Sequence, residues 1–206
     1  MGSTRLPGKV MRQLAGKPMI QLIIERLSEC TKVDEIILAT GDGPENEILA
    51  RFVVQLGVNV YRGSENDVLD RYRAAARAYG LTEIVRATGD NPFVDAEECD
   101  RLIDFRRIHD LDYAAATPSC GGGLPDGVGV EIMTRDALER SWREGRDAHH
   151  REHINEYIHE HPELFTQDTL TTPTVKNAPS IFLTVDTEDE FLFAESLLVQ
   201  WQSEGY

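Results

Sequence analysis

Residues 83–109, EIVRATGDNPFVDAEECDRLIDFRRIH, place a strand, a turn and a helix in direct succession. The β-branched run EIVRAT (83–88) predicts a strand, and GDNPFVD supplies the glycine, proline and aspartate typical of a loop. Residues 95–109 are expected to form a helix. A strand that leads directly into a helix is the repeating unit of α/β folds, so this stretch predicts the fold class.

The same alternation runs through the rest of the chain. Helices are expected over residues 17–30, 45–56, 64–79, 135–144, 149–160 and 187–203. Strands are expected over residues 35–40, 58–61, 112–117, 128–134 and 181–186. This order favours a mainly parallel sheet with helices on both faces, in one domain that spans residues 1–206. The region from about 112 to 160 breaks the order and is interpreted as an inserted arm that builds a dimer contact or an acceptor lid.

The composition excludes several classes of protein. The chain has 206 residues, of which 41% are hydrophobic and 28% charged, as is typical of a soluble globular domain. Its formal charge of −15 disfavours a nucleic-acid partner. No apolar run reaches the length of about 18 residues that a membrane-spanning helix needs, and the first residues do not resemble a signal peptide. The three cysteines form no CxxC pair, which favours a reducing cytoplasm over a disulfide framework or a zinc ribbon.

The first nine residues, MGSTRLPGK, have the composition of a phosphate-binding loop. The contributing residues are Gly2 and Gly8 for tight turns, Ser3 as a hydroxyl donor, and Arg5 and Lys9 as cations. The loop is not a Walker motif, because Val10 stands where that motif has serine or threonine. A basic surface turn is the alternative interpretation of the same residues.

Two aspartates are expected at the ends of strands, where open α/β sheets bind their ligands. Asp90 follows the strand 83–88, and Asp186 ends the strand 181–186. Together they could hold Mg²⁺, which takes few protein ligands and leaves the remaining positions to water and phosphate. The alternatives are an Asx turn at Asp90 and a helix N-cap at Asp186.

A cationic loop and two such acids are together what nucleotidyl transfer needs. Cations neutralise the β- and γ-phosphates, and a metal held by the acids polarises the α-phosphate for in-line attack. Because the chain is acidic overall, an anionic substrate needs a local basic pocket, which Arg71 and Arg86 are candidates to extend.

Other polar residues are weaker candidates. Asp126 and Glu131 are candidates for acceptor binding, with turn and surface roles as equal alternatives. His149 and His153 have the i, i+4 spacing of a metal pair, but no third ligand is evident and a surface or interface helix is the favoured interpretation. No serine–histidine–acid set and no cysteine nucleophile for covalent catalysis is indicated.

At these positions the chain resembles the CMP-sugar synthetase superfamily of cytidylyltransferases, and within it most resembles the spore-coat polysaccharide biosynthesis SpsF branch. The resemblance runs nearly end to end. It is carried by MGSTRLPGKV (1–10), GKPMI (16–20), RGSENDVLDRY (62–72), VRATGDNPFVD (85–95), LPDGVGVEI (124–132), REH (151–153), HPELF (161–165) and TVDTEDEF (184–191).

The resemblance implies a three-layer α/β/α nucleotidyltransferase fold and a homodimer. It implies an enzyme that joins CMP from CTP to a sugar hydroxyl, with Mg²⁺, and releases pyrophosphate. Ser3, Arg5 and Lys9 would hold the triphosphate, and Asp90 and Asp186 match the metal-binding acids. Arg71 and Arg86 match arginines of the SpsF pattern. The sugar is expected to be acidic, in the biosynthesis of a surface polysaccharide.

The chain departs from the family pattern in two places. The family's loop follows a central strand reading roughly IIQAR or IIPAR, whereas this sequence begins at the methionine after it. Absence of that strand would leave its neighbours unpaired. We therefore expect either that the natural protein starts further upstream or that this chain is impaired in nucleotide binding. Gly129 also stands where the SpsF pattern often has an acid, which weakens an acceptor role for this strand.

Two other functions fit the same residues. One is a related nucleotidyl or glycosyl transferase that uses another nucleotide. The other is a truncated, non-catalytic family member that acts as a partner subunit.

Overall fold

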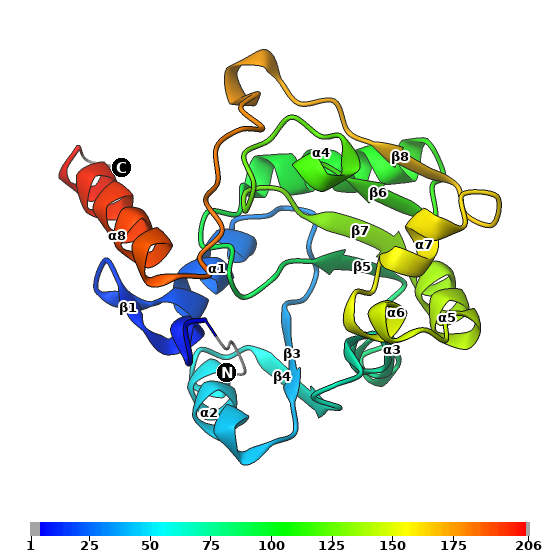
Figure 1. The fold of residues 1–206 in the computed structure, drawn as a ribbon, viewed down its shortest axis with the longest axis horizontal. Helices are drawn as coiled ribbons and strands as arrows, with labels where there is room; N and C mark the ends of the chain where they lie inside the picture. The colour runs from blue at the N-terminus through cyan, green and yellow to red at the C-terminus, as the bar shows by residue number, and fades with distance from the viewer. Residues whose placement is uncertain (1–4, 205–206) are drawn as a thin grey trace.

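The computed structural model describes residues 5–204, which form helices around mixed β-sheets (Figure 1). The α-helices are α1 (Met19–Ser28), α2 (Glu47–Gln55), α3 (Val68–Ala78), α4 (Ala96–Ile108), α5 (Arg135–Glu144), α6 (Ala148–Glu152), α7 (Glu156–Glu160) and α8 (Glu188–Ser203). Short 3-10 helices are η1 (Lys9–Met11), η2 (Pro44–Asn46), η3 (Pro118–Cys120) and η4 (Thr174–Lys176). The strands are β1 (Gln13–Leu14), β2 (Lys17–Pro18), β3 (Ile37–Gly41), β4 (Asn59–Gly63), β5 (Glu83–Arg86), β6 (Tyr113–Ala115), β7 (Glu131–Thr134) and β8 (Gln167–Thr169).

The main sheet has the strand order β5-β7-β6-β8. Strand β7 pairs antiparallel with both β5 and β6, whereas β6 and β8 are parallel. A second sheet pairs β3 and β4 in parallel, and β1 and β2 form a small antiparallel hairpin. The expected α/β class is therefore confirmed, with ladders that are mixed rather than mainly parallel.

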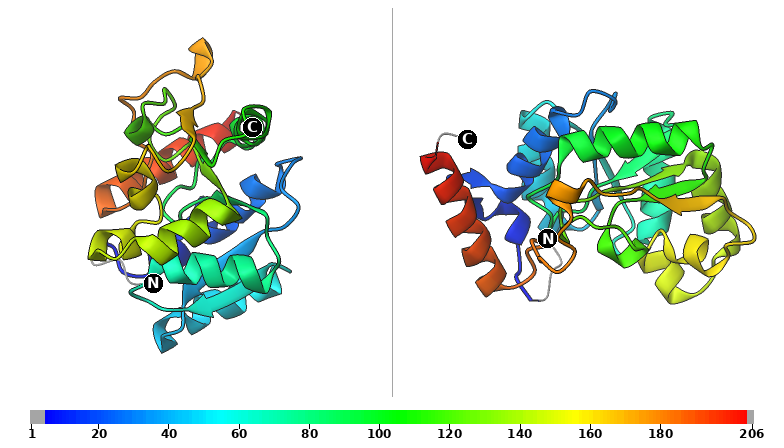
Figure 2. Two further views of the ribbon diagram at one scale, coloured as in Figure 1. Left: turned by 90° about the vertical axis from the view of Figure 1, so that its right-hand side faces the viewer. Right: turned by 90° about the horizontal axis from the view of Figure 1, so that it is seen from above.

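Alternate residues of the main sheet face helices on opposite sides. Ile132 packs with Leu102 of α4, and its neighbour Met133 packs with Leu138 of α5. All four side chains are fully buried. Burial of each such side chain contributes about 1.5–3 kcal/mol. The period of two along β7 thus produces the expected three layers, and Figure 2 shows α4 and the α5–α7 region on opposite sides of the strands.

A groove separates the two larger sheets. Among the described residues no ladder joins β3 to β5. Between them lies a groove of about 630 Å³ with apolar side chains such as Ile24, Leu38 and Ile84 along it. The absence of the family's first strand stays a prediction.

The structure corrects the expected arm at 112–160. Strands β6 and β7 are inner strands of the main sheet, so the first part of this region belongs to the core. The expected helix at 149–160 is divided into α6 and α7. His153 between them has an extended backbone, with φ of −116° and ψ of 107°, and Ile154 after it is fully buried in a core cluster with Leu138 of α5.

The expected strand at 181–186 was wrong. This segment forms only an isolated bridge, between Phe182 and Asp126. Its neighbours are loops. The backbone N–H of Leu183 donates to the carbonyl oxygen of Asp126, and that of Val185 donates to the carbonyl oxygen of Asp90. Since no regular strand within residues 5–204 borders the segment, no ladder extends along it there.

No helix within residues 5–204 is both long enough and apolar enough to span a membrane.

Candidate active site

Lys9 is at the centre of a charged cluster drawn from three distant parts of the chain. Gly8 has a φ of 69°, a left-handed conformation that suits glycine and turns the chain into η1. Lys9 follows it, with only 8% of its surface exposed. Its Nζ donates to the carbonyl oxygen of Val185 at 2.8 Å, to Oδ1 of Asp186 at 2.7 Å and to Oδ2 of Asp90 at 3.5 Å. Each ammonium hydrogen therefore has an acceptor, as burial of an ammonium requires.

Asp90 lies in the loop after β5, as the sequence predicted. The hydroxyl of Thr88 donates to its Oδ1, which leaves Oδ2 facing Lys9. Its backbone carbonyl accepts the N–H of Val185 at 2.8 Å. This bond ties the loop after β5 to the segment that precedes α8, and so holds Asp90 close to Asp186.

Asp186 is positioned by the start of α8. Oε2 of Glu190 accepts the backbone N–H groups of Asp186 and Thr187, each at 2.8 Å. The bond from the Asp186 N–H is the main reason that the pKa of Glu190 is lowered. On its side chain, Asp186 uses Oδ1 for Lys9 and Oδ2 for Arg5, whose Nη2 lies 2.7 Å away.

This arrangement can bind a metal and phosphate oxygens. The carboxylates of Asp90 and Asp186 converge on one nitrogen, that of Lys9, and their side chains are 30% and 26% exposed. Two converging carboxylates with access to water are a donor set that fits Mg²⁺, which keeps several water ligands. Arg5 and Lys9 provide cations directly beside them, where phosphate oxygens could bind.

The structure thus brings together four of the predicted site residues, Arg5, Lys9, Asp90 and Asp186. Gly2 and Ser3 lie outside the described residues. Sequence reasoning missed Thr88, although its place between the strand and Asp90 is a signal for a local hydroxyl–carboxylate bond.

Arg86 and Glu131 form a second, more buried pair where β5 meets β7. Nη1 of Arg86 donates to Oε2 of Glu131 at 3.1 Å, and Asn155 Nδ2 donates to Oε1 at 3.1 Å. Burial of Arg86 opposes its charged form, but the nearby Glu131 carboxylate outweighs this and the pKa of Arg86 is raised. The Nε of Arg86 is buried without a partner among the described residues. The surface alternative for Glu131 does not apply, because its side chain is 8% exposed.

The side-chain hydrogen bonds of Arg71 and Asp126 go to nearby loops. Nη1 of Arg71 donates to the carbonyl oxygens of Ser64 and Glu65. Oδ2 of Asp126 accepts the hydroxyl of Thr184 at 3.1 Å, as expected for a residue that fixes a turn.

The groove between β3 and β5 borders both arginines and the loop that carries Asp90. Thr88 and Gly89, which precede Asp90, line it, as do Arg71 and Arg86. A ligand whose phosphates lay against Lys9 could therefore extend toward the two arginines.

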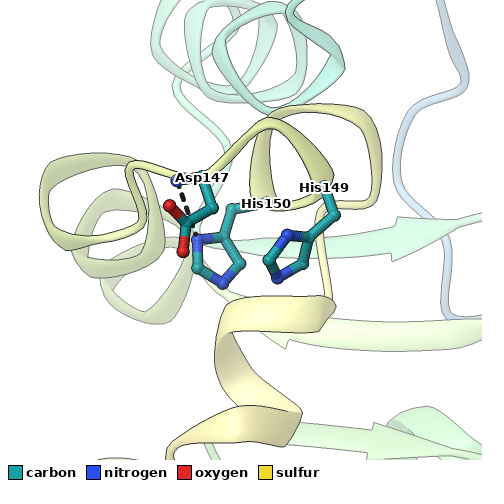
Figure 3. Close-up of side chains that lie close together, drawn as sticks. All are labelled: Asp147, His149 and His150. Carbon is teal, nitrogen blue, oxygen red and sulfur yellow. Dashed lines mark hydrogen bonds between the residues drawn. The ribbon is translucent and has the colours of Figure 1, made fainter.

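The histidines of α6 form a separate cluster with Asp147 and Glu160, and Figure 3 shows Asp147, His149 and His150. Nε2 of His149 and Nε2 of His150 lie 2.8 Å and 2.7 Å from the two carboxylate oxygens of Glu160. Nδ1 of His150 accepts the backbone N–H of Asp147 at 3.3 Å, so the ring proton of His150 is on Nε2. That tautomer does not fit a metal ligand at Nε2, and His153, the other half of the predicted pair, is an exposed helix C-cap.

Comparison with known proteins identifies the family. A family model described as cytidylyltransferase matches residues 1–203. The spore coat polysaccharide biosynthesis protein SpsF of Bacillus subtilis is 34% identical over 213 residues, which cover 100% of this chain and 84% of that protein. An uncharacterized protein of Methanocaldococcus jannaschii is 37% identical over 190 residues, which cover 92% of this chain and 76% of the relative.

Solved structures agree with this assignment. A cytidylyltransferase from Leptospira borgpetersenii superposes on this chain with a TM-score of 0.85 at 26% identity. The match covers 98% of this chain and 92% of the Leptospira chain. CMP:2-keto-3-deoxy-manno-octonic acid synthetase in complex with CTP has the same fold, with a TM-score of 0.74 at 20% identity. The match covers 97% of this chain and 95% of the synthetase chain. The motifs, the fold and these matches together establish that the chain belongs to the cytidylyltransferase family of enzymes.

Proposed function

We propose that this protein transfers CMP from CTP to the hydroxyl group of an acidic sugar and releases pyrophosphate, for the synthesis of a surface polysaccharide. The proposal rests chiefly on Lys9, which lies between two converging carboxylates with Arg5 beside them. Similarity to SpsF supports the polysaccharide context. A homodimer in the cytoplasm stays a prediction.

In the proposed reaction the acceptor hydroxyl oxygen attacks the α-phosphorus in line, and the bond from that phosphorus to the bridging oxygen breaks. Pyrophosphate leaves with that oxygen, and the hydroxyl proton is released to water. Lys9 and Arg5 hold the phosphate oxygens. Mg²⁺ held by Asp90 and Asp186 would, when bound, polarise the α-phosphate. With Asp90 and Asp186 engaged in this way, Lys9 and Arg5, which now contact these carboxylates, would be free to bind phosphate oxygens. Positioning and charge neutralisation then carry most of the catalysis.

The acceptor is proposed to bind further along the groove. Arg71 and Arg86 line this part, and two cations favour an anionic ligand there. Glu131 stands beside Arg86 and can accept a hydrogen bond from a sugar hydroxyl. An acidic sugar would satisfy both kinds of side chain.

The first test is thermal unfolding with CTP, UTP, ATP or GTP, each with and without Mg²⁺. A nucleotide present at about 100 times its dissociation constant stabilises the fold by roughly 2.7 kcal/mol, so binding appears as a raised midpoint. A rise selective for CTP with Mg²⁺ is expected, followed by pyrophosphate release with sugar acids. A selective rise with another nucleotide would contradict CTP as substrate, and a cooperative transition that no nucleotide shifts would favour a non-catalytic partner subunit.

Variants test the metal residues. Asp90→Asn and Asp186→Asn should each abolish turnover while the protein stays folded. Asp136→Asn is the matched control, because Asp136 is an exposed aspartate in the first turn of α5 and remote from the cluster. Near-full activity of either site variant would refute the metal role.

A further inference from the structure

Cys120, His159 and Gln167 form a continuous chain of polar contacts although they come from η3, α7 and β8. The sulfur of Cys120 lies 3.7 Å from Nε2 of His159. The other ring nitrogen, Nδ1, lies 3.1 Å from Oε1 of Gln167. The sequence did not reveal this chain, because 39 residues separate the thiol from the imidazole.

The contacts of Gln167 decide which nitrogen of His159 carries the proton. Nε2 of Gln167 donates to the carbonyl oxygen of Ile158 at 3.1 Å, so the amide oxygen must be the atom that faces His159. An amide oxygen only accepts, so Nδ1 of His159 is the protonated nitrogen. Nε2 then has a free lone pair directed at Cys120, which is the arrangement in which an imidazole takes the proton of a thiol.

The surroundings favour the resulting thiolate–imidazolium pair. Burial raises the pKa of Cys120, but the interactions with His159, Thr117 and Tyr113 together outweigh it and the net pKa is lowered. The contact with Cys120 is the main reason that the pKa of His159 is raised, and Glu131 adds to it. The hydroxyl of Tyr113 lies 3.5 Å from the sulfur, and its pKa is raised by burial, so it remains protonated as a donor.

The other two cysteines have a different environment. Cys30 and Cys99 are buried and hydrogen-bonded to each other, and no histidine is among the groups that shift their pKa. Cys120 is partly exposed. A small reagent in water therefore reaches Cys120 but not the buried pair.

We propose that Cys120 is a nucleophilic thiol and a site of modification by small hydroperoxides, with His159 as its base and Gln167 as a positioning residue. The thiolate sulfur attacks one peroxide oxygen, an S–O bond forms and the O–O bond breaks. The leaving hydroxide takes the proton of the His159 imidazolium and departs as water. Sulfur is oxidised by two electrons to the sulfenic acid, and the peroxide is reduced.

Modification would reach the acceptor side of the candidate active site. Asn155 bonds to Glu131 and also interacts with the hydroxyl of Tyr113, which contacts Cys120. Added bulk or polarity on the sulfur therefore presses on the side chains that hold Glu131. The oxidation of Cys120 is independent of the proposed function, because it concerns the thiol itself.

Iodoacetamide labelling of the folded protein, followed by mass spectrometry of each cysteine peptide, tests the nucleophile between pH 5.5 and 9. Cys120 should be alkylated at pH 6.5 about tenfold faster than in His159→Gln, since an ordinary thiol with a pKa near 8.5 is about 1% ionised there and a low-pKa thiolate is a somewhat weaker nucleophile. Cys30 and Cys99 serve as internal controls and should stay unlabelled. His161→Gln is the matched variant, because His161 bonds to the Tyr157 carbonyl instead.

Two further measurements test the nucleophile without the His159→Gln variant, in case that variant does not fold. The wild-type rate should show a plateau that extends below pH 7, and Gln167→Leu should reduce it. Hydrogen peroxide should convert Cys120 to the sulfenic acid, which dimedone captures as a thioether with loss of water. A wild-type rate that rises with pH as for an ordinary thiol would overturn the nucleophile, and absence of the dimedone adduct at Cys120 would overturn the peroxide step.

Discussion

Nζ of Lys9 lies 2.7 Å from Oδ1 of Asp186, a residue 177 positions away in the chain. This ion pair joins the N-terminal loop to the start of α8 and places both beside Asp90. The lysine side chain is only 10% exposed, and its ammonium group contacts both Asp90 and Asp186.

Removal of the Lys9 ammonium should abolish nucleotide binding and turnover. In Lys9→Met the two carboxylates face each other without the cation, and the β- and γ-phosphates lose theirs. We expect pyrophosphate release to fall by at least about 100-fold, as for loss of a charged transition-state contact. Lys17→Met, which removes an exposed lysine paired with Glu25, should retain activity. Equal losses in both variants would show a general effect of charge.

The N-cap of α8 should matter for activity, whereas an equivalent cap elsewhere should not. Thr187 caps α8 next to Asp186, and Thr134 caps α5 in the same way through the N–H of Ala137. Thr187→Ala and Thr134→Ala should each lower the free energy of unfolding by about 1 kcal/mol. Only Thr187→Ala should also lower kcat, because the Thr187 hydroxyl accepts the N–H of Glu190, whose carboxylate holds the backbone of Asp186. Equal kcat values would contradict this role of the cap.

The buried pair of Arg86 and Glu131 should be sensitive to removal of one partner only. Glu131→Met leaves a guanidinium uncompensated and should cost about 3–5 kcal/mol in urea unfolding. The double variant Arg86→Met/Glu131→Met should recover most of that stability. If the pair binds the acceptor, the double variant should keep its CTP-induced stabilisation but show a raised KM for the sugar. An unchanged KM for the sugar would show that neither Arg86 nor Glu131 binds the acceptor.

Glu83 should make stability depend on acid pH. Burial raises its pKa, but hydrogen bonds from Arg107 and Arg106 outweigh this and the net pKa is lowered. The carboxylate therefore stabilises the fold fully above its ordinary value of 4.5, and this contribution is lost as the pH falls through the lower, folded value. Glu83→Gln should be less stable than the wild type at pH 7, with the difference shrinking toward pH 3. A constant difference in urea unfolding would exclude the linkage.

The sequence by itself determined the α/β class, most helix positions and the identity of the charged cluster. Apolar spacing and the strand–loop–helix order depend on neighbouring residues, so local rules can recover them. Lys9, Asp90 and Asp186 could be singled out because each follows or forms a polar turn of the kind that binds ligands at the edge of a sheet.

Only the tertiary structure decided the remaining features. It showed that β6 and β7 lie within the main sheet, that one expected helix is interrupted at His153, and that 181–186 is bordered by loops. It also brought Cys120 to His159. The physical reason is common to all of these: strand pairing and side-chain contact depend on which distant segments pack together, and no local pattern in the chain encodes that choice.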